Sequence, residues 1–222
     1  MTPAGLSPAR VHPTAVVEDA VVLGAGTSVW DNVHIRRGAR IGEECIIGDK
    51  THIAYDVRIG NRVKIGAFAN ICPGVTVEDG VFIAMGVIFT NDLFPRATTP
   101  DLRHLLPSEP DERTLATRVG AGASIGANTT VRGGVEIGRW AMVGMAALVT
   151  RSVAPFHLVI GAPARPVGAV CRCGELVLRF PAQAPGASAD VSAPDVAHAP
   201  CPRCGLAYAL RGGQIIELAP PE

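Results

Sequence analysis

Residues 41–71 read IGEECIIGDKTHIAYDVRIGNRVKIGAFANI, and every sixth position of this stretch, starting from Ile41, is isoleucine. The same period continues with large apolar residues from Val17 to Phe89, and again from Val119 to Val149. Four places after each of these residues stands a small or β-branched one. Because side chains of a strand alternate between two faces, the small residue and the next large one both point inward. A hexapeptide period of this kind predicts an all-β chain built as a parallel β-helix.

The period also predicts the domain organisation. Three hexads form one triangular coil of about eighteen residues, and successive coils stack at roughly 4.8 Å. We expect a loose N-terminus over 1–10 and coils over 11–154, interrupted by an excursion over 92–118 that is rich in Pro, Asp, Arg and Thr. An exit segment over 155–170 and a cysteine-bearing module over 171–222 follow. Long loops in compact folds are commonly functional, which makes the excursion a candidate part of a site.

Composition excludes several classes of partner. The 222-residue chain has a formal net charge of zero, with 20 Lys and Arg against 20 Asp and Glu. Because these charges are interspersed, neither nucleic acid nor an anionic membrane is expected as the main partner. Residues 1–13 contain no continuous apolar run, so we expect no signal peptide, and no stretch is apolar enough for a transmembrane helix. These features, with the cysteine spacing described below, predict a cytoplasmic protein with reduced thiols.

Residues eighteen apart should stack on one face of the predicted prism. The outward residues of the three faces are, in turn, Val16, His34, His52, Asn70 and Ile88; Val22, Arg40, Arg58 and Thr76; and Ser28, Ile46, Lys64 and Phe82. The third face is the most apolar, and a monomer has little reason to expose it. We therefore expect another subunit to cover that face.

Two histidines on the first face are candidate catalytic residues. His34 and His52 lie one coil apart, and a neutral imidazole near pH 7 is a natural general base. Asn91 falls at the corner that borders this face, where the excursion begins with Asp92. We expect these four residues and Asn70 to converge on one cleft. The alternative for each histidine alone is an outward polar residue without a catalytic role.

Four cysteines near the end of the chain occur in two pairs, each followed by glycine: Cys171 with Cys173, and Cys201 with Cys204. Four thiolates on two turns suit a tetrahedral, structural zinc site, since they leave no open position for a substrate. The apolar segments 176–178 and 215–218 are candidate strands of a small zinc ribbon. Two disulfides or free thiols are the alternatives, and a reducing cytoplasm argues against disulfides.

Three strings give the chain a resemblance to a known family: FTNDLFPRA at 89–97, VGAGASIGAN at 119–128 and GAPAR at 161–165. With the hexads, they resemble the nucleotide-sugar N-acetyltransferases of the left-handed β-helix class, over about residues 11–170. Those enzymes transfer acetyl from acetyl-CoA to the 3-amino group of a UDP- or dTDP-linked sugar. The resemblance implies left-handed coiling, acetyl-CoA as donor, and a homotrimer with its sites between subunits.

The resemblance also implies site residues. Asn91 matches the asparagine that holds the sugar amine, and His34 matches a histidine in the same Trp-x-x-Val-His context. Arg96 matches a loop arginine suited to the sugar or its pyrophosphate through charge-assisted hydrogen bonds. The candidate substrate-binding residues are Asn70, Asp92, Arg96 and Tyr55. The candidate coenzyme A contacts are Gly144, Ala146, Arg151 and Arg165.

Departures from the family pattern restrict what is carried over. Where the family commonly has Gln-Asn in the coils that face the substrate, this chain has GDKTH at 48–52 and GAFAN at 66–70. His52 is therefore this chain's own variation, and the identity of the sugar is not implied.

The sequence predicts an acetyl-CoA-dependent N-acetyltransferase in which a sugar amine attacks the thioester directly, assisted by His52 or His34. One alternative is an O-acetyltransferase that acts on a sugar hydroxyl. A second is a metal hydratase like the γ-class carbonic anhydrases, which needs a third convergent histidine, whereas His104 lies in the excursion. A third is a non-catalytic assembly module, which predicts no coenzyme A binding.

Overall fold

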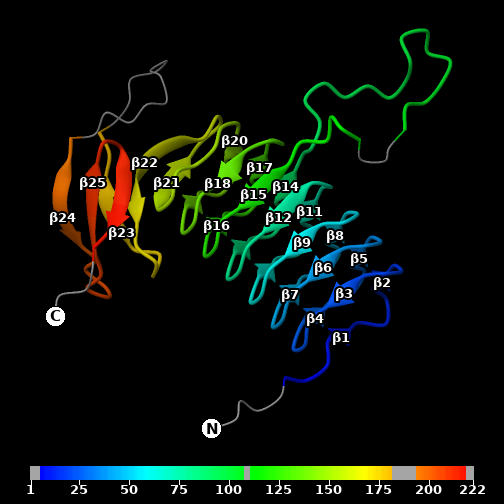
Figure 1. Ribbon diagram of the computed structural model, residues 1–222, viewed down its shortest axis with the longest axis horizontal. Helices are drawn as coiled ribbons and strands as arrows, with labels where there is room; N and C mark the ends of the chain where they lie inside the picture. Colours follow the sequence, from blue (N-terminus) through cyan, green and yellow to red (C-terminus); the bar gives the residue numbers. More distant parts are fainter. Residues whose placement is uncertain (1–5, 108–110, 182–193, 219–222) are drawn as a thin grey trace.

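The computed structural model describes residues 6–107, 111–181 and 194–218 (Figure 1). Within these ranges the named secondary-structure elements are all β-strands, from β1 (Arg10–Val11) to β26 (Gln214–Glu217). The predicted all-β class is therefore confirmed. In the same ranges, no helix is long and apolar enough to cross a membrane.

Short parallel strands stack into the three walls of a prism (Figure 1). The first wall contains β2 (Val16–Val17), β5 (His34–Ile35), β8 (His52–Ile53), β11 (Asn70–Ile71), β14 (Ile88–Phe89), β17 (Thr130–Val131) and β20 (Leu148–Val149). The second contains β3 (Val22–Leu23), β6 (Arg40–Ile41), β9 (Arg58–Ile59), β12 (Val75–Val77), β15 (Thr117–Val119) and β18 (Glu136–Ile137). The third begins with β1 and continues through β4 (Ser28–Val29), β7 (Ile46–Ile47), β10 (Lys64–Ile65), β13 (Phe82–Ile83), β16 (Ser124–Ile125) and β19 (Met142–Val143).

The hexad positions fill the prism as the period predicts. Ile35, Ile53 and Ile71 are fully buried, and Ile53 pairs in register with both of its neighbours along the wall. Buried threonines occupy some of the small inward positions, and their hydroxyls form hydrogen bonds to the next coil. Thr51 Oγ1, for example, donates to the carbonyl of Gly66 at 3.0 Å. Each coil therefore depends on the coils next to it for burial and for hydrogen bonds.

Glycine after the large apolar residue is required by the close stacking of the turns. A Cβ added to Gly66 would lie 2.5 Å from the backbone N of Met85 in the next coil. Real Cβ atoms do not approach a backbone atom so closely, so a larger residue at this turn would push neighbouring coils apart.

The excursion leaves the prism after β14 and returns at β15, and it extends away from the walls (Figure 1). Thr98 and Leu105 form an antiparallel bridge within it. Phe94 and Leu102 are 89% and 80% exposed, although both are large and apolar. The excursion is thus an arm with one antiparallel bridge that exposes large apolar side chains.

The chain after the coils does not form a separate ribbon. β21 (His157–Ile160) pairs in parallel with β19, and β22 (Arg165–Val170) and β23 (Leu176–Arg179) extend the same sheet in antiparallel fashion. The expected boundary at residue 171 falls in the turn of the β22–β23 hairpin. β24 (Val196–Pro200), β25 (Ala207–Arg211) and β26 make a second, three-stranded sheet. The two expected ribbon strands therefore exist, as β23 and β26, but in different sheets.

His157 is a buried titratable residue at the end of the prism. Its side chain is 4% exposed, its Nδ1 lies 3.0 Å from the carbonyl of Pro155, and its ring centroid lies 5.4 Å from that of Phe180. Burial lowers the pKa of His157 below its ordinary value of 6.5. The unfolded chain consequently binds a proton at this residue more readily than the folded chain does.

This depressed pKa predicts a loss of stability in acid. The contribution of neutral His157 is complete above about pH 6.5 and decreases as the pH falls through that value. We expect the melting temperature to fall between about pH 7.5 and about pH 5.5, and to fall less in a His157→Gln variant. The exposed His12 provides the control, since His12→Gln should leave the pH dependence of the wild type intact. Equal acid sensitivity in His157→Gln and wild type would contradict the prediction.

Candidate functional site

The first wall brings the predicted histidines and asparagine together. His34 pairs in register with His52, and His52 pairs with Asn70 on the following strand. The two imidazole centroids lie 5.7 Å apart with their planes at 82°, so the rings meet edge to face. We call His34, His52 and Asn70 the histidine face.

A chain of hydrogen bonds orients His52. Cys72 Sγ donates to the carbonyl of Phe89 at 2.9 Å, and Asn70 Nδ2 lies 3.9 Å from that sulfur. Asn70 Oδ1 faces His52 Nδ1 at 3.0 Å and accepts a hydrogen bond from the Nδ1–H of the ring. Burial, aided by the charge of Asp92, raises the pKa of Cys72, which keeps its thiol a donor. In neutral His52 this leaves Nε2 as the unprotonated nitrogen, which is the form that a general base requires.

Glu18 orients His34, and sequence reasoning missed it. His34 Nε2 lies 2.8 Å from Glu18 Oε1, and the same carboxylate accepts a backbone hydrogen bond from Arg37 at 2.9 Å. The Arg37 N–H lowers the pKa of Glu18 against the effect of desolvation, and His34 adds to the lowering. Glu18 is therefore an ionised partner for His34. Its spacing could have revealed it, because Glu18 lies eighteen residues, or one coil, before Arg36. Arg36 Nε lies 2.8 Å from Glu18 Oε1.

The predicted residue Tyr55 lies at the edge of this arrangement. The guanidinium of Arg36 stacks over its ring at 4.3 Å from the centroid. Tyr55 thus packs against Arg36, the arginine that pairs with Glu18. One face of the Tyr55 ring is therefore already covered by Arg36.

The root of the excursion borders the histidine face. Gly133 N donates to Thr90 Oγ1 at 3.2 Å, and Leu115 N donates to the carbonyl of Asn91 at 3.1 Å. Asp92 is near enough to Cys72 for its charge to raise the pKa of that thiol. The start of the excursion is thus fixed beside the network that holds His52.

Arg96 is not brought to the histidine face within one chain. It is exposed on the excursion, and its Nη1 donates to the carbonyl of Pro95 at 3.0 Å. Among the described residues, no hydrogen bond or ion pair joins it to His34 or His52.

The candidate coenzyme A residues follow one another along the last coils. Gly144 N donates to the Val159 carbonyl and Ala146 N to the Ala127 carbonyl, both at 2.8 Å. Both N–H groups therefore already donate to backbone carbonyls. In this conformation they are not free to donate to the negatively charged oxygen that forms when an amine attacks a thioester. Arg165, in β22, is half-buried and donates from Nη1 to the carbonyl of Ala164 at 3.1 Å.

Arg151 belongs to the same part of the chain. It lies two residues after the end of β20 and is exposed. Its guanidinium is therefore accessible to an anionic ligand from solvent.

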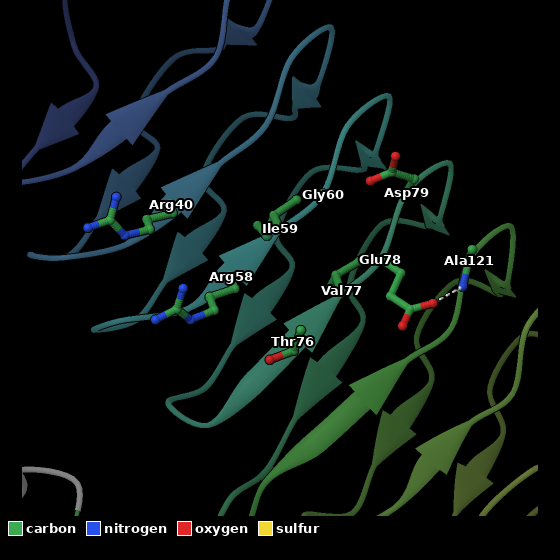
Figure 2. A pocket seen from close by; sticks show the side chains of 9 residues that line it. All are labelled: Arg40, Arg58, Ile59, Gly60, Thr76, Val77, Glu78, Asp79 and Ala121. Atoms are coloured by element: carbon green, nitrogen blue, oxygen red, sulfur yellow. Dashed lines mark hydrogen bonds between the residues drawn. The ribbon is translucent and has the colours of Figure 1, made fainter.

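A pocket on the second wall carries two arginines that sequence reasoning placed on this face without assigning them a role (Figure 2). Arg40 and Arg58 pair in register, and Figure 2 shows their side chains projecting side by side. Glu78, also in the pocket, is bound by Arg118 Nε and by the N–H of Ala121, each at 2.9 Å. In the described part of the chain, neither Arg40 nor Arg58 forms an ion pair. The pocket is a candidate subsite for an anionic group such as a phosphate.

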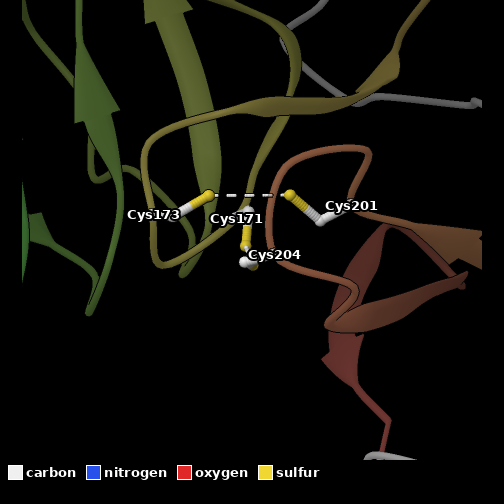
Figure 3. Close-up of side chains that lie close together, drawn as sticks. All are labelled: Cys171, Cys173, Cys201 and Cys204. Atoms are coloured by element: carbon white, nitrogen blue, oxygen red, sulfur yellow. Dashed lines mark hydrogen bonds between the residues drawn. The ribbon is translucent and has the colours of Figure 1, made fainter.

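The four C-terminal cysteines come together from two turns (Figure 3). All four Sγ atoms of Cys171, Cys173, Cys201 and Cys204 lie within 4.8 Å of one another, so the cluster is able to hold a metal ion. Among the described residues, this is the only group of three or more His, Cys, Asp or Glu side chains so arranged. Three convergent histidines, as the hydratase alternative requires, do not occur in that part of one chain.

The coils match known repeat families. Residues 38–71 and 56–91 match the family described as "Bacterial transferase hexapeptide (six repeats)". The coils of this chain form a parallel β-helix with a hexapeptide repeat. Residues 116–151 of this hexapeptide-repeat protein also match the family "Hexapeptide repeat of succinyl-transferase". The matches lie on both sides of the excursion, and the first range includes His52 and Asn70.

The hexapeptide-repeat protein is similar to a dTDP-3-amino-3,6-dideoxy-alpha-D-galactopyranose 3-N-acetyltransferase of Aneurinibacillus thermoaerophilus. The two are 49% identical over 57 residues, which cover 26% of this chain and 30% of the relative. Among solved structures, PerB from Caulobacter crescentus, bound to CoA and GDP-perosamine, is 25% identical, with a TM-score of 0.43 over 73% of this chain and 58% of PerB. A mutant of AntD, an N-acyltransferase from Bacillus cereus bound to dTDP and coenzyme A, is 17% identical, with a TM-score of 0.49 over 75% of this chain and 85% of AntD.

Proposed function

We propose that this hexapeptide-repeat protein is an acetyl-CoA-dependent N-acetyltransferase whose acceptor is the amino group of a nucleotide-linked sugar. The observation that carries the proposal is the arrangement of His52. Its Nδ1 is held by Asn70, its Nε2 is left as the basic nitrogen, and it stands beside the fixed start of the excursion. The similarity to a sugar-nucleotide 3-N-acetyltransferase over 57 residues supports the acceptor class.

The proposed reaction uses few groups. A sugar amine with a pKa near 7.7–8.0, like an α-amino group, is partly neutral near pH 7. Its nitrogen attacks the thioester carbonyl, the C–S bond breaks, and the coenzyme A thiolate leaves. His52 Nε2 accepts the proton that the nitrogen loses, and His34, backed by Glu18, is the neighbouring candidate for the same task. Asn91 orients the amine, and orientation alone supplies a large part of the rate.

We propose that the remaining candidates bind the two substrates. Asn70, Asp92, Arg96 and Tyr55 would contact the nucleotide sugar, and Gly144, Ala146, Arg151 and Arg165 would contact coenzyme A. Among the described residues Arg96 makes no hydrogen bond or ion pair to the histidine face of its own chain, which suits a site shared between subunits.

A homotrimer is part of the proposal. Ile46 and Phe82 are each 41% exposed on the third wall, and the excursion exposes Phe94. Apolar surface of this kind on two elements is explained if neighbouring copies cover it. The six unpaired cysteines fit a reducing compartment, so we place the enzyme in the cytoplasm.

Acceptor screening tests the proposed function. The chain is incubated with acetyl-CoA and with dTDP-, UDP- or GDP-linked amino sugars, and released thiol and product mass are measured. The matched control is the same sugar nucleotide with a hydroxyl in place of the amine. We expect thiol release and an N-acetylated product with at least one amino sugar. Turnover of the hydroxy sugars alone would instead establish an O-acetyltransferase, and absence of acetyl-CoA binding in calorimetry would favour a non-catalytic module.

A further inference from the structure

We propose that Cys171, Cys173, Cys201 and Cys204 hold one zinc ion that fastens the terminal three-stranded sheet to the end of the β-helix as its cap. The site is remote from the histidine face, and the inference is independent of the proposed acetyl transfer. Its basis is the placement of four thiols from two different sheets around one point (Figure 3).

The sulfur geometry fits a metal better than it fits disulfides. The Sγ atoms of Cys171 and Cys204 lie 3.3 Å apart, and those of Cys173 and Cys201 lie 3.5 Å apart. A disulfide requires about 2.05 Å. Four sulfurs at the zinc–sulfur bond length of about 2.3 Å form a tetrahedron with edges of about 3.8 Å. The observed separations of 3.3 Å to at most 4.8 Å surround that value.

The surroundings of the cluster are those of a ligand site. The hydroxyl of Tyr208, a fully buried side chain, donates to Cys171 Sγ at 3.2 Å and accepts the N–H of Arg172 at 3.1 Å. Such a bond is strongest to a thiolate, the form in which cysteine binds a metal. Gly174 and Gly205 follow the two cysteine pairs with φ of +87° and +76°, a conformation that closes each turn without the strain a larger side chain would suffer.

The donor set selects the type of metal and its role. Soft thiolates in a four-coordinate arrangement favour zinc among common cellular ions. Cys171 and Cys201 are buried, 2% and 3% exposed, and a thiolate at either position would need a cation nearby. Because all four positions around the ion are taken by protein, the role is structural.

The two cysteine pairs belong to two different sheets of the structure. Cys171 and Cys173 lie in the turn of the β22–β23 hairpin, which continues the third wall of the prism. Cys201 and Cys204 lie between β24 and β25 of the separate sheet. Further links between them include the hydrogen bonds of Tyr208 described above, the packing of Phe156 against Tyr208, with ring centroids 5.4 Å apart, and an ion pair between Arg172 and Glu217.

A sheet this small needs such a fastening. Three short strands bury little apolar surface, and small units of this kind usually depend on a metal or disulfide. The last coil of a solenoid also needs a cap, because its open end exposes apolar side chains and unpaired backbone groups. Here Phe156, at the end of the coils, packs in one cluster with Tyr208 and Leu210 of β25. The metal would hold this cap closed.

Metal analysis of the full-length chain tests the site. Protein purified in reductant without added metal should contain one zinc per chain, and Cys201→Ser or Cys204→Ser should lose most of it. Cys45→Ala, which removes a buried thiol inside the coils, is the matched control and should keep its zinc. Protein without zinc, or full zinc content in both serine variants, would overturn the proposal.

Hydrogen exchange tests the capping role. Removal of the metal with a chelator under reducing conditions should speed amide exchange in β25 by about two orders of magnitude or more, while β8 and β11 stay protected. Unchanged exchange in β25 after complete metal loss would overturn the capping role. Acetyl transfer measured in the acceptor screen has no bearing on either readout, so failure of the proposed function is distinguishable from failure of the zinc cap.

Discussion

Replacement of His52 by alanine is expected to lower kcat/KM for acetyl transfer by about 10²- to 10⁴-fold near pH 7, the usual contribution of a general base. The structure gives the reason. Asn70 Oδ1 accepts from His52 Nδ1, so the basic Nε2 is the nitrogen left to take a proton from the incoming amine. The measurement is initial-rate thiol release as a function of pH.

Two variants make this test specific. His12→Ala removes an exposed histidine near the start of the coils and should keep the wild-type rate. Asn70→Ala removes the partner of His52 but not the imidazole, so we expect a smaller loss of kcat/KM than in His52→Ala. Full kcat in His52→Ala would remove His52 from the mechanism and leave orientation with proton transfer by other groups.

Ile71→Ala is expected to destabilise the chain by about 2–5 kcal/mol, the usual cost of truncating a fully buried isoleucine. Ile71 is 0% exposed and pairs in register with Ile53 on the inside of the first wall. Because each coil is stabilised only by its neighbours, the cavity would weaken the coils on both sides.

Denaturant unfolding measures this loss. Ile216→Ala in β26 is the matched control, because that side chain is 41% exposed and its truncation should cost much less. Similar destabilisation by the two variants would contradict the packing inferred for the prism.

The coils and their three faces could be predicted from the sequence because one physical rule, inward burial every six residues, acts on every coil. The pairing of His34 with His52 and Asn70 follows from that rule alone. Glu18 and Cys72 could not be found in the same way. Both lie outside the outward strand positions. The role of Glu18 depends on a hydrogen bond to His34 on the next coil, and that of Cys72 on its contacts with the nearby Asn70 side chain and with the Phe89 carbonyl of the next coil.

The end of the chain was predictable in composition but not in topology. The cysteine spacing indicated one cluster, and the structure brings the four sulfurs together. β22 and β23 pair in antiparallel fashion, with shifts in register. The sequence of this hairpin therefore lacks the six-residue period that made the coils predictable. The sequence suggested a small zinc-ribbon-like module over 171–222, and its first cysteine pair lies in the turn of the β22–β23 hairpin, in the sheet that continues the third wall of the prism.

A crystal structure of the chain with coenzyme A and the accepted nucleotide amino sugar tests the location of the site most directly. We predict that the acceptor nitrogen lies within about 3.2 Å of His52 Nε2, with the sugar beside the start of the excursion at Asn91. A sugar bound instead on the second wall, against Arg40 and Arg58 and out of reach of both histidines, would contradict the assignment of the histidine face.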